Sequence, residues 1–151
     1  MKKLKVIVCK AGNGVSAHIE GIDGFVIARN TVYSLKKDLP EGLRFHIEGL
    51  YEEERKPWMN GNYDFEYVFQ DIPTLVEAYN GLLNQSSLAR ISGINTGQMR
   101  QYASGIKRPT ERTLQRIELG LKRYAFELQS VSFNCSYKEY YKNKTIKSKT
   151  P

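Results

Sequence analysis

The segment QSSLARISGINTGQMRQYAS, residues 85–104, decides the fold of the C-terminal half of the chain. Its spacing is that of two short helices that cross closely at a tight turn. Ala89 is small enough to let the second helix approach the first, and Gly93 falls at the corner, where the backbone needs conformational freedom. Ser92 is more polar than a helix interface favours, and Asn95 can cap the second helix. Four larger side chains are expected to face inward: Leu88, Ile94, Met99 and Tyr102.

The outward side of the second helix is the candidate recognition surface. In a helix-turn-helix, outward side chains at this place contact base edges in the major groove of DNA. The positions expected there are Thr96, Gly97, Arg100 and Gln101. Arg can make paired hydrogen bonds to guanine, and Gln can make them to adenine. A second set of residues is expected to contact phosphates: Gln85, Ser86, Lys107, Arg108 and Arg112.

Ordinary amphipathic hairpins are the alternative interpretation of this segment. The small residue, the corner glycine and the four apolar positions occur together, which favours the DNA-binding motif. A leading helix is expected over residues 73–83, and a following helix over 110–128. The latter has apolar residues at steps of three and four: Leu114, Ile117, Leu121, Tyr124 and Leu128. Residues 73–128 thereby resemble the compact DNA-binding domains of lambda- and Xre-type repressors.

Charge is divided unevenly along the chain. Residues 1–72 carry ten Lys or Arg and eleven Asp or Glu, a net of −1, whereas residues 73–151 carry thirteen and five, a net of +8. A localised positive field attracts phosphate and steers encounter with nucleic acid. Basic tails can also serve solubility alone, and residues 138–149 hold five of the thirteen basic residues. The excess of basic residues remains without this tail, because residues 73–137 carry eight Lys or Arg and four Asp or Glu.

Composition limits the other classes of function. The chain has 151 residues, of which 40% are hydrophobic, enough for one domain or two small ones. No apolar run is long enough to span a membrane, and the N-terminus lacks the apolar core of a signal peptide. We therefore expect a cytoplasmic protein with reduced thiols at Cys9 and Cys135. The cysteines and the two histidines, His18 and His46, are too isolated to predict a metal or cofactor site, and we interpret both histidines as half-buried structural residues.

The N-terminal half has the period-two pattern of strands. Strands are expected over residues 4–10, 15–20, 25–29 and 63–69. A helix capped by Asn30 or Thr31 is expected to run to Leu50, bent or split by Pro40 and Gly42. The fold class is therefore α+β, a β-β-β-α-β domain followed by an all-α domain. The expected boundaries are residues 1–70, 71–133 and a basic, disordered tail over 134–151. Three interpretations of the aromatic-rich end stay open: a short strand at residues 130–133 that pairs across a dimer, contact with a nucleic-acid backbone, and a loosely held tail.

A family resemblance rests on the segment GVSAHIEGIDGFV, residues 14–26, followed by Asn30, Thr31 and a helix. This pattern resembles the N-terminal domain of HicB-type antitoxins, which combine a partial RNase H-like domain with a small DNA-binding domain. Taken with the helix-turn-helix, the resemblance covers residues 4–128. It implies that the N-terminal domain neutralises a small HicA-type RNA-cleaving toxin by steric occlusion. It also implies a homodimer, or a higher homo-oligomer, that binds double-stranded operator DNA and represses its own operon.

Two alternatives stay open. The chain could be a stand-alone repressor whose N-terminal domain oligomerises or senses a ligand. It could instead be a metal-dependent nuclease, because RNase H-like chemistry uses converging carboxylates to hold two metal ions. The candidate carboxylates are Glu20, Asp23, Asp64, Glu66 and Asp71. No Asp lies centrally in the first strand, so these carboxylates are interpreted as solvated surface groups; we expect no catalytic residues, and a protein that is not an enzyme.

Overall fold

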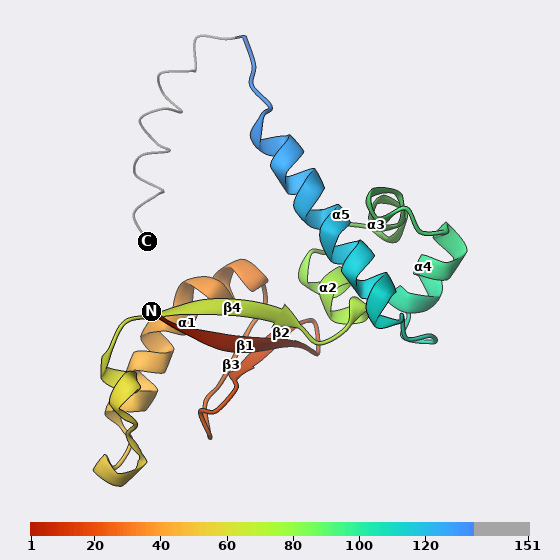
Figure 1. Cartoon of the computed structure of the whole chain (residues 1–151). Coiled ribbons are helices and arrows are strands. Elements are labelled where there is room, and N and C mark those ends of the chain that lie inside the picture. The colour runs from red at the N-terminus through yellow and green to blue at the C-terminus, as the bar shows by residue number, and fades with distance from the viewer. Residues whose placement is uncertain (135–151) are drawn as a thin grey trace.

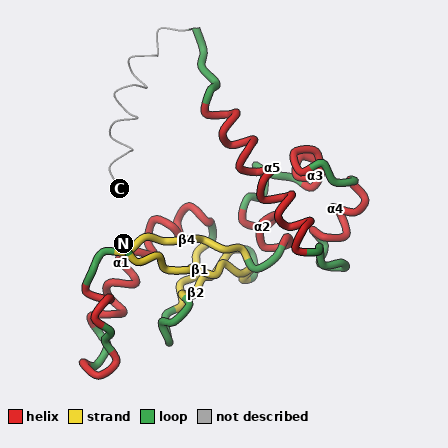
Figure 2. Tube along the Cα trace, in the orientation of Figure 1, coloured by secondary structure: helices red, strands yellow, loops and turns green. Residues whose placement is uncertain are grey.

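The computed structural model describes residues 1–134, which form an α+β fold (Figure 1). Strands β1 (Lys2–Ala11), β2 (Gly14–Ile19) and β3 (Val26–Arg29) are followed by helix α1 (Val32–Glu48). Two short 3₁₀ helices, η1 (Glu52–Glu54) and η2 (Pro57–Asn60), lead to strand β4 (Tyr63–Phe69). Helices α2 (Ile72–Ala78), α3 (Gln85–Ser92), α4 (Thr96–Ala103) and α5 (Glu111–Gln129) complete this part of the chain. Figure 2 shows the strands gathered in the N-terminal half and only helices beyond them.

The expected class and the order of three strands, a helix and a strand are confirmed. The described chain beyond α5 has no regular structure, and a strand at residues 130–133 that pairs across a dimer stays one of the open interpretations. The disordered tail expected over residues 134–151 lies outside the described residues, apart from Asn134. None of the described helices has the length and apolar character needed to cross a lipid bilayer.

The four strands form one mixed sheet in the order β3-β2-β1-β4. β1 and β2 are an antiparallel hairpin that pairs Val6 with Ile19, and β3 continues antiparallel to β2. β4 returns parallel to β1 and pairs Tyr67 with Val6. A parallel pair requires a crossover connection, which α1 and the two 3₁₀ helices supply. β3 and β4 are therefore the two edges of this sheet.

Helix α1 packs on one face of the sheet and closes the first hydrophobic core. Its apolar residues Leu35, Leu39 and Leu43 are fully buried against alternate residues of β1 and β2. The Thr31 hydroxyl caps the helix by accepting a hydrogen bond from the backbone N–H of Ser34. Of the bend or split expected at Pro40 and Gly42, the split does not occur: α1 is one continuous helix from Val32 to Glu48. Pro40 is exposed, so its ring points away from the core and solvent can hydrogen-bond the backbone group left without a partner.

The helices of the C-terminal half close a second core, which is joined to the first by packing. Asp71 caps α2 by accepting hydrogen bonds from the backbone N–H and the hydroxyl of Thr74, at 2.8 and 2.6 Å. The rings of Phe69 and Tyr79 lie 5.8 Å apart, and both side chains contact both cores. α2 ends at Ala78, earlier than the helix expected to reach residue 83, and Gly81 then turns with φ +84°. The buried residues of the second core are Ile72, Leu75, Leu88, Ala89, Ile94, Met99, Tyr102 and Ile117.

Candidate nucleic-acid interface

The corner between α3 and α4 has the geometry that the sequence predicts. Gly93 ends α3 in the left-handed region, with φ +66° and ψ +33°, and the backbone N–H of Ile94 donates to the carbonyl of Ala89 at 3.0 Å. Ala89 is buried, so the two helices approach closely there. All four side chains expected to face inward are buried, and Leu88 and Met99 are completely inaccessible to solvent.

The N-terminus of α4 is capped by Asn95, as predicted. Its Oδ1 accepts hydrogen bonds from the backbone N–H groups of Gly97 at 2.8 Å and Gln98 at 3.3 Å. A Cβ atom at position 97 would lie 3.1 Å from this same Oδ1. Gly97 therefore has a structural reason to be glycine, because it leaves room for the cap as well as exposing backbone.

The outward face of α4 contains all four predicted base-reading positions. Successive residues of a helix are rotated by about 100°, so Thr96, Gly97, Arg100 and Gln101 fall within about 140° of one another. All four are exposed, whereas Met99 and Tyr102 are buried on the opposite side. The prediction that these residues face outward is confirmed. Such a face presents one guanidinium, one amide and one hydroxyl group on a rigid, capped helix.

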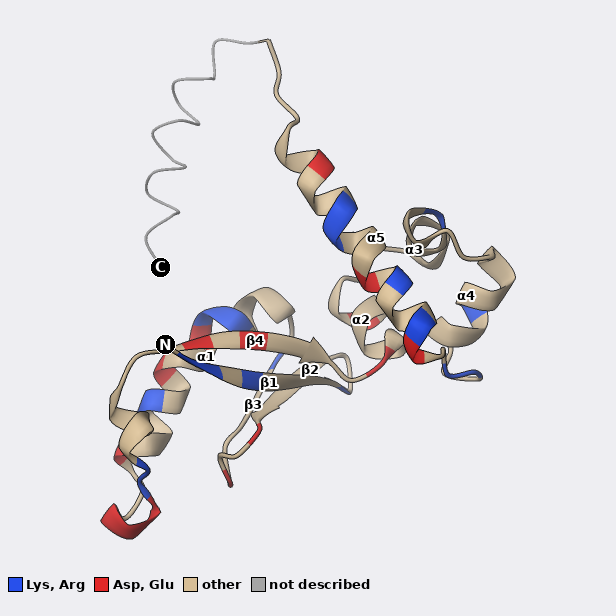
Figure 3. Ribbon diagram, viewed as in Figure 1, with Lys and Arg blue, Asp and Glu red and all other residues tan. Residues whose placement is uncertain are grey.

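Basic residues flank this face in the loop between α4 and α5. Lys107 and Arg108 are exposed, and the backbone N–H of Lys107 donates to the carbonyl of Gln101 at 3.2 Å. The loop closes where the Thr110 hydroxyl caps α5, and Arg112 is exposed on its first turn. Residues 85–110 contain four Lys or Arg and no Asp or Glu. Figure 3 shows this basic loop beside α4, where the chain enters α5.

The start of α3 is the second place where phosphate contacts were predicted. Asn84 caps the helix, and its Oδ1 accepts from the backbone N–H of Ser87 at 2.8 Å and from the Ser87 hydroxyl at 2.9 Å. Ser86 is exposed. Gln85 is half-buried, so its side chain has less freedom to reach a phosphate than the sequence suggests. The positive end of a helix and its first amides favour an anion at this place.

Two residues that shape the interface were not predicted from the sequence. Arg116 of α5 reaches the corner and donates a hydrogen bond from Nη2 to the carbonyl of Gly93 at 2.7 Å. Gly120 is buried where α5 crosses α3, and a Cβ atom there would lie 2.4 Å from the carbonyl oxygen of Ile91. The sequence did contain a signal for Gly120. A glycine inside a helical pattern lowers the stability of the helix, and Gly120 lies beside the apolar positions Ile117 and Leu121.

Ser92 is the position that the sequence identifies as more polar than a helix interface favours. Its side chain is buried in the second core, and its hydroxyl has no hydrogen-bond partner among the described residues. A buried hydroxyl without a partner destabilises the folded state, since it gives up its hydrogen bonds to water.

The candidate carboxylates of the N-terminal half are either exposed or used within the fold. Glu20 lies 3.5 Å from the ammonium group of Lys5, and Asp71 is occupied by the cap of α2. Within residues 1–134 no three His, Cys, Asp or Glu side chains are placed to hold a metal ion. His46 is half-buried, and its Nε2 lies 3.1 Å from the carbonyl oxygen of Asp23. His18 is exposed on the open face of the sheet, so the expectation that it is half-buried was wrong.

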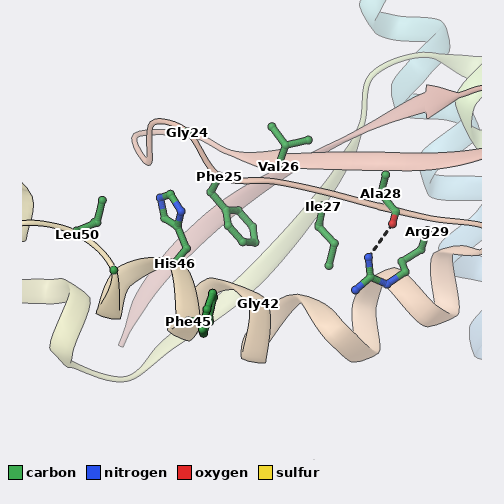
Figure 4. Close-up of a pocket in the computed structure, with 11 residues that line it drawn as sticks. Gly24, Phe25, Val26, Ile27, Ala28, Arg29, Gly42, Phe45, His46 and Leu50 are labelled. Carbon is green, nitrogen blue, oxygen red and sulfur yellow. Dashed lines mark hydrogen bonds between the residues drawn. The ribbon is translucent and has the colours of Figure 1, made fainter.

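An exposed groove runs between β3 and α1 (Figure 4). Phe25 and Ile27 point from the strand toward α1, while Val26 points to the other side. Arg29 donates to its neighbour's carbonyl, that of Ala28, at 2.7 Å and to the carboxylate of Asp38 at 2.9 Å. The two ionisable side chains of the groove, Arg29 and His46, thus both have hydrogen-bond partners within the protein.

The opposite edge of the sheet carries a row of half-buried aromatic side chains, Trp58, Tyr63, Phe65 and Tyr67, here called the β4 aromatic row. Neighbouring rings lie 5.7–6.4 Å apart. The ammonium group of Lys36 lies 4.6 Å above the ring of Tyr67, and burial lowers the pKa of Lys36 and raises the pKa of Tyr67. No described strand pairs with the outer edge of β4, so its backbone groups lie beside these rings.

Comparisons with known proteins identify no relative of this chain. The chain matches no protein-family model, no curated protein and no solved structure.

Proposed function

We propose that α3 and α4 form a helix-turn-helix and that the protein is a sequence-specific DNA-binding repressor. The observation that carries this proposal is the outward face of α4, with Thr96, Gly97, Arg100 and Gln101 exposed on a helix fixed by a cap and a buried core. A rigid helix with such side chains can enter a major groove and read base edges. Lys107, Arg108 and Arg112 would contact the phosphates beside it, with Ser86 and Gln85 at the start of α3.

Electrostatics supports the same assignment. The acid-free segment 85–110 presents cationic side chains around the outward face. Phosphate contacts supply affinity for any duplex, and the side chains of α4 supply the preference among sequences. The chain therefore has both components that specific DNA binding needs.

Selection of duplexes from a random pool by the full chain tests this proposal. We expect enrichment of a motif with two-fold symmetry, whose half-sites lie about 34 Å, one helical turn, apart. Binding of all duplexes with equal affinity, with no motif enriched, would contradict it.

The N-terminal half supports a second component of the proposal, the antitoxin function. Two points favour an antitoxin function. One is the resemblance of residues 14–26 to HicB-type antitoxins. The other is the β4 aromatic row, which lies beside a strand edge with which no described strand pairs. An open edge can bind another chain through its backbone groups, while neighbouring rings supply apolar contact. We propose that the partner chain is a small HicA-type toxin, which is inhibited because its surface is covered.

Co-expression with the product of the neighbouring gene tests the antitoxin component. A stable complex that contains both chains and lacks RNA-cleaving activity is the expected result. If the chain purifies alone under gentle conditions while still binding DNA, the stand-alone repressor is the better description.

A further inference from the structure

The corner between α3 and α4 is held by a side chain from a third helix. Arg116 of α5 donates a hydrogen bond from Nη2 to the carbonyl oxygen of Gly93 at 2.7 Å. A Cβ atom at position 93 would lie 3.3 Å from this same Nη2, so the guanidinium group lies against the corner itself. The contact therefore ties the corner to a helix that lies outside the two helices of the proposed motif.

The charges at this contact are complementary. Gly93 ends α3, and carbonyl groups at the C-terminus of a helix carry the negative end of its dipole. The guanidinium group keeps its positive charge in proteins, and a hydrogen bond with one charged partner is about twice as strong as a bond between neutral groups. None of the ion pairs among residues 1–134 involves Arg116, so no described carboxylate competes with the carbonyl of Gly93.

The backbone that carries Arg116 is fixed by close packing of α5 on α3 (Figure 1). Ile117, the next residue, is buried in the second core. Gly120, one turn later, lies so near α3 that a Cβ atom there would be 2.4 Å from the carbonyl oxygen of Ile91. Because protein interiors are close-packed, α5 cannot shift along α3 without a clash or a cavity. Arg116 therefore extends from a fixed point on α5 to the corner.

The corner in turn positions the start of α4. Only Ile94, whose side chain is buried, separates Gly93 from the cap residue Asn95. The Oδ1 atom of Asn95 accepts hydrogen bonds from the backbone N–H groups of Gly97 and Gln98. A displacement of the Gly93 carbonyl would thus pass through this short segment to the first turn of α4, where the outward face begins.

We propose that Arg116 is a positioning residue for α4: through its bond to Gly93 it sets the angle at which the outward face of α4 meets a duplex. This inference rests on the proposed function and deepens it, because it names a residue outside the helix-turn-helix that governs the preference among sequences. In this role Arg116 contacts neither bases nor phosphates.

The two kinds of DNA contact respond differently to a tilted helix. Hydrogen bonds to base edges weaken steeply when donor and acceptor are misaligned, and paired bonds from Arg100 or Gln101 require both donor and acceptor atoms in register. The attraction between a cationic side chain and a phosphate falls off gradually with distance, so Lys107 and Arg108 tolerate a small displacement. Loss of the Arg116 bond should therefore reduce discrimination among sequences and leave the affinity for an arbitrary duplex nearly unchanged.

Anisotropy titrations of Arg116→Met in the full chain test this role. The variant keeps an unbranched side chain but loses the hydrogen-bond donors and the charge. Its dissociation constant for the selected duplex should rise about tenfold, whereas the constant for a scrambled duplex and the slope of log affinity against log salt should stay close to those of the wild type. The matched control is Arg123→Met, because Arg123 is an exposed arginine about two turns farther along the same helix. It removes the same charge and should bind both duplexes like the wild type.

Amide hydrogen exchange of the chain without DNA, followed by NMR, supplies a second measurement. Exchange at the capped amides of Gly97 and Gln98 should be faster in Arg116→Met than in the wild type and in Arg123→Met, because the start of α4 opens locally more often. The amide of Leu88, in the buried part of α3, should exchange at the rate of the wild type.

Three results would overturn the inference. One is an Arg116→Met variant that discriminates the two duplexes as well as the wild type. The second is an equal loss of affinity for both duplexes with a salt slope reduced by about one, which would make Arg116 a phosphate contact. The third is equally faster exchange throughout α3 and α4, which would show that Arg116 only stabilises the fold. A wild-type chain that discriminates no sequences would overturn the proposed function instead, and the exchange measurement would still test whether Arg116 orders the start of α4.

Discussion

A Cβ atom added at Gly120 would lie 2.4 Å from the carbonyl oxygen of Ile91. This relationship sets how closely α5 crosses α3, because the obstacle is rigid backbone and not a side chain that can rotate away. It also places Arg116, one turn earlier on α5, within hydrogen-bonding distance of the corner at Gly93. The orientation of α4, the proposed recognition helix, thus depends on a glycine of α5 that packs against α3.

Gly120→Ala should therefore destabilise the fold, even though alanine is the better helix former. Overpacking against backbone costs about 1–3 kcal/mol, which exceeds the gain of roughly 1 kcal/mol in helix propensity. Gly42→Ala on α1 is the matched control, because its new Cβ would meet Phe25 at an ordinary 3.8 Å. Urea unfolding should show a lower midpoint for the first variant and an equal or higher one for the second. A midpoint for Gly120→Ala at or above that of the wild type would show that the crossing has room for a methyl group.

Ser92→Ala should stabilise the protein. The Ser92 hydroxyl is buried without a partner, and removal of such a group recovers about 1 kcal/mol or more of desolvation free energy. Thermal unfolding should show a higher midpoint for this variant, while Ser86→Ala, at an exposed position, should change it little. A lower midpoint for Ser92→Ala would mean that the hydroxyl is hydrogen-bonded in solution.

Lys107→Ala should weaken binding to all duplexes by the same factor. This lysine is placed to contact phosphate and not bases, so its loss should reduce the slope of log affinity against log salt by about one. Anisotropy titrations of a specific and a nonspecific duplex at several salt concentrations measure that slope. A change confined to one sequence would assign Lys107 to base recognition instead.

The sequence predicted the helical unit well because local chemistry determines it. The Gly93 corner and the Asn95 cap follow from backbone preferences, and the buried set from Leu88 to Tyr102 follows from helical periodicity. The predicted bounds of β4 agree with the observed ones, because its alternation of aromatic and acidic residues is clear.

What the sequence could not predict depends on contacts between distant segments. Pro40 and Gly42 predicted a helix that is bent or split, but the position of Pro40 on the solvent side of α1 lets the helix continue without a split. Arg116 and Gly120 gain their roles only because α5 crosses α3, which no local pattern specifies. The apolar steps through Tyr124 and Leu128 predicted one apolar face of a helix, which the periodicity alone could not place as covered or open; the structure leaves its last turns exposed.

The central claim is that Arg100 on the outward face of α4 reads a base. The most direct test is an anisotropy titration of Arg100→Ala against the selected duplex and its single base-pair variants, with Arg44→Ala on α1 as the control. Loss of a base contact costs about 1–3 kcal/mol, so the dissociation constant should rise roughly 5- to 150-fold. Discrimination should be lost at one base pair while the control binds like the wild type. If Arg100→Ala binds as tightly as the wild type and discriminates every base pair equally well, α4 is not the recognition helix.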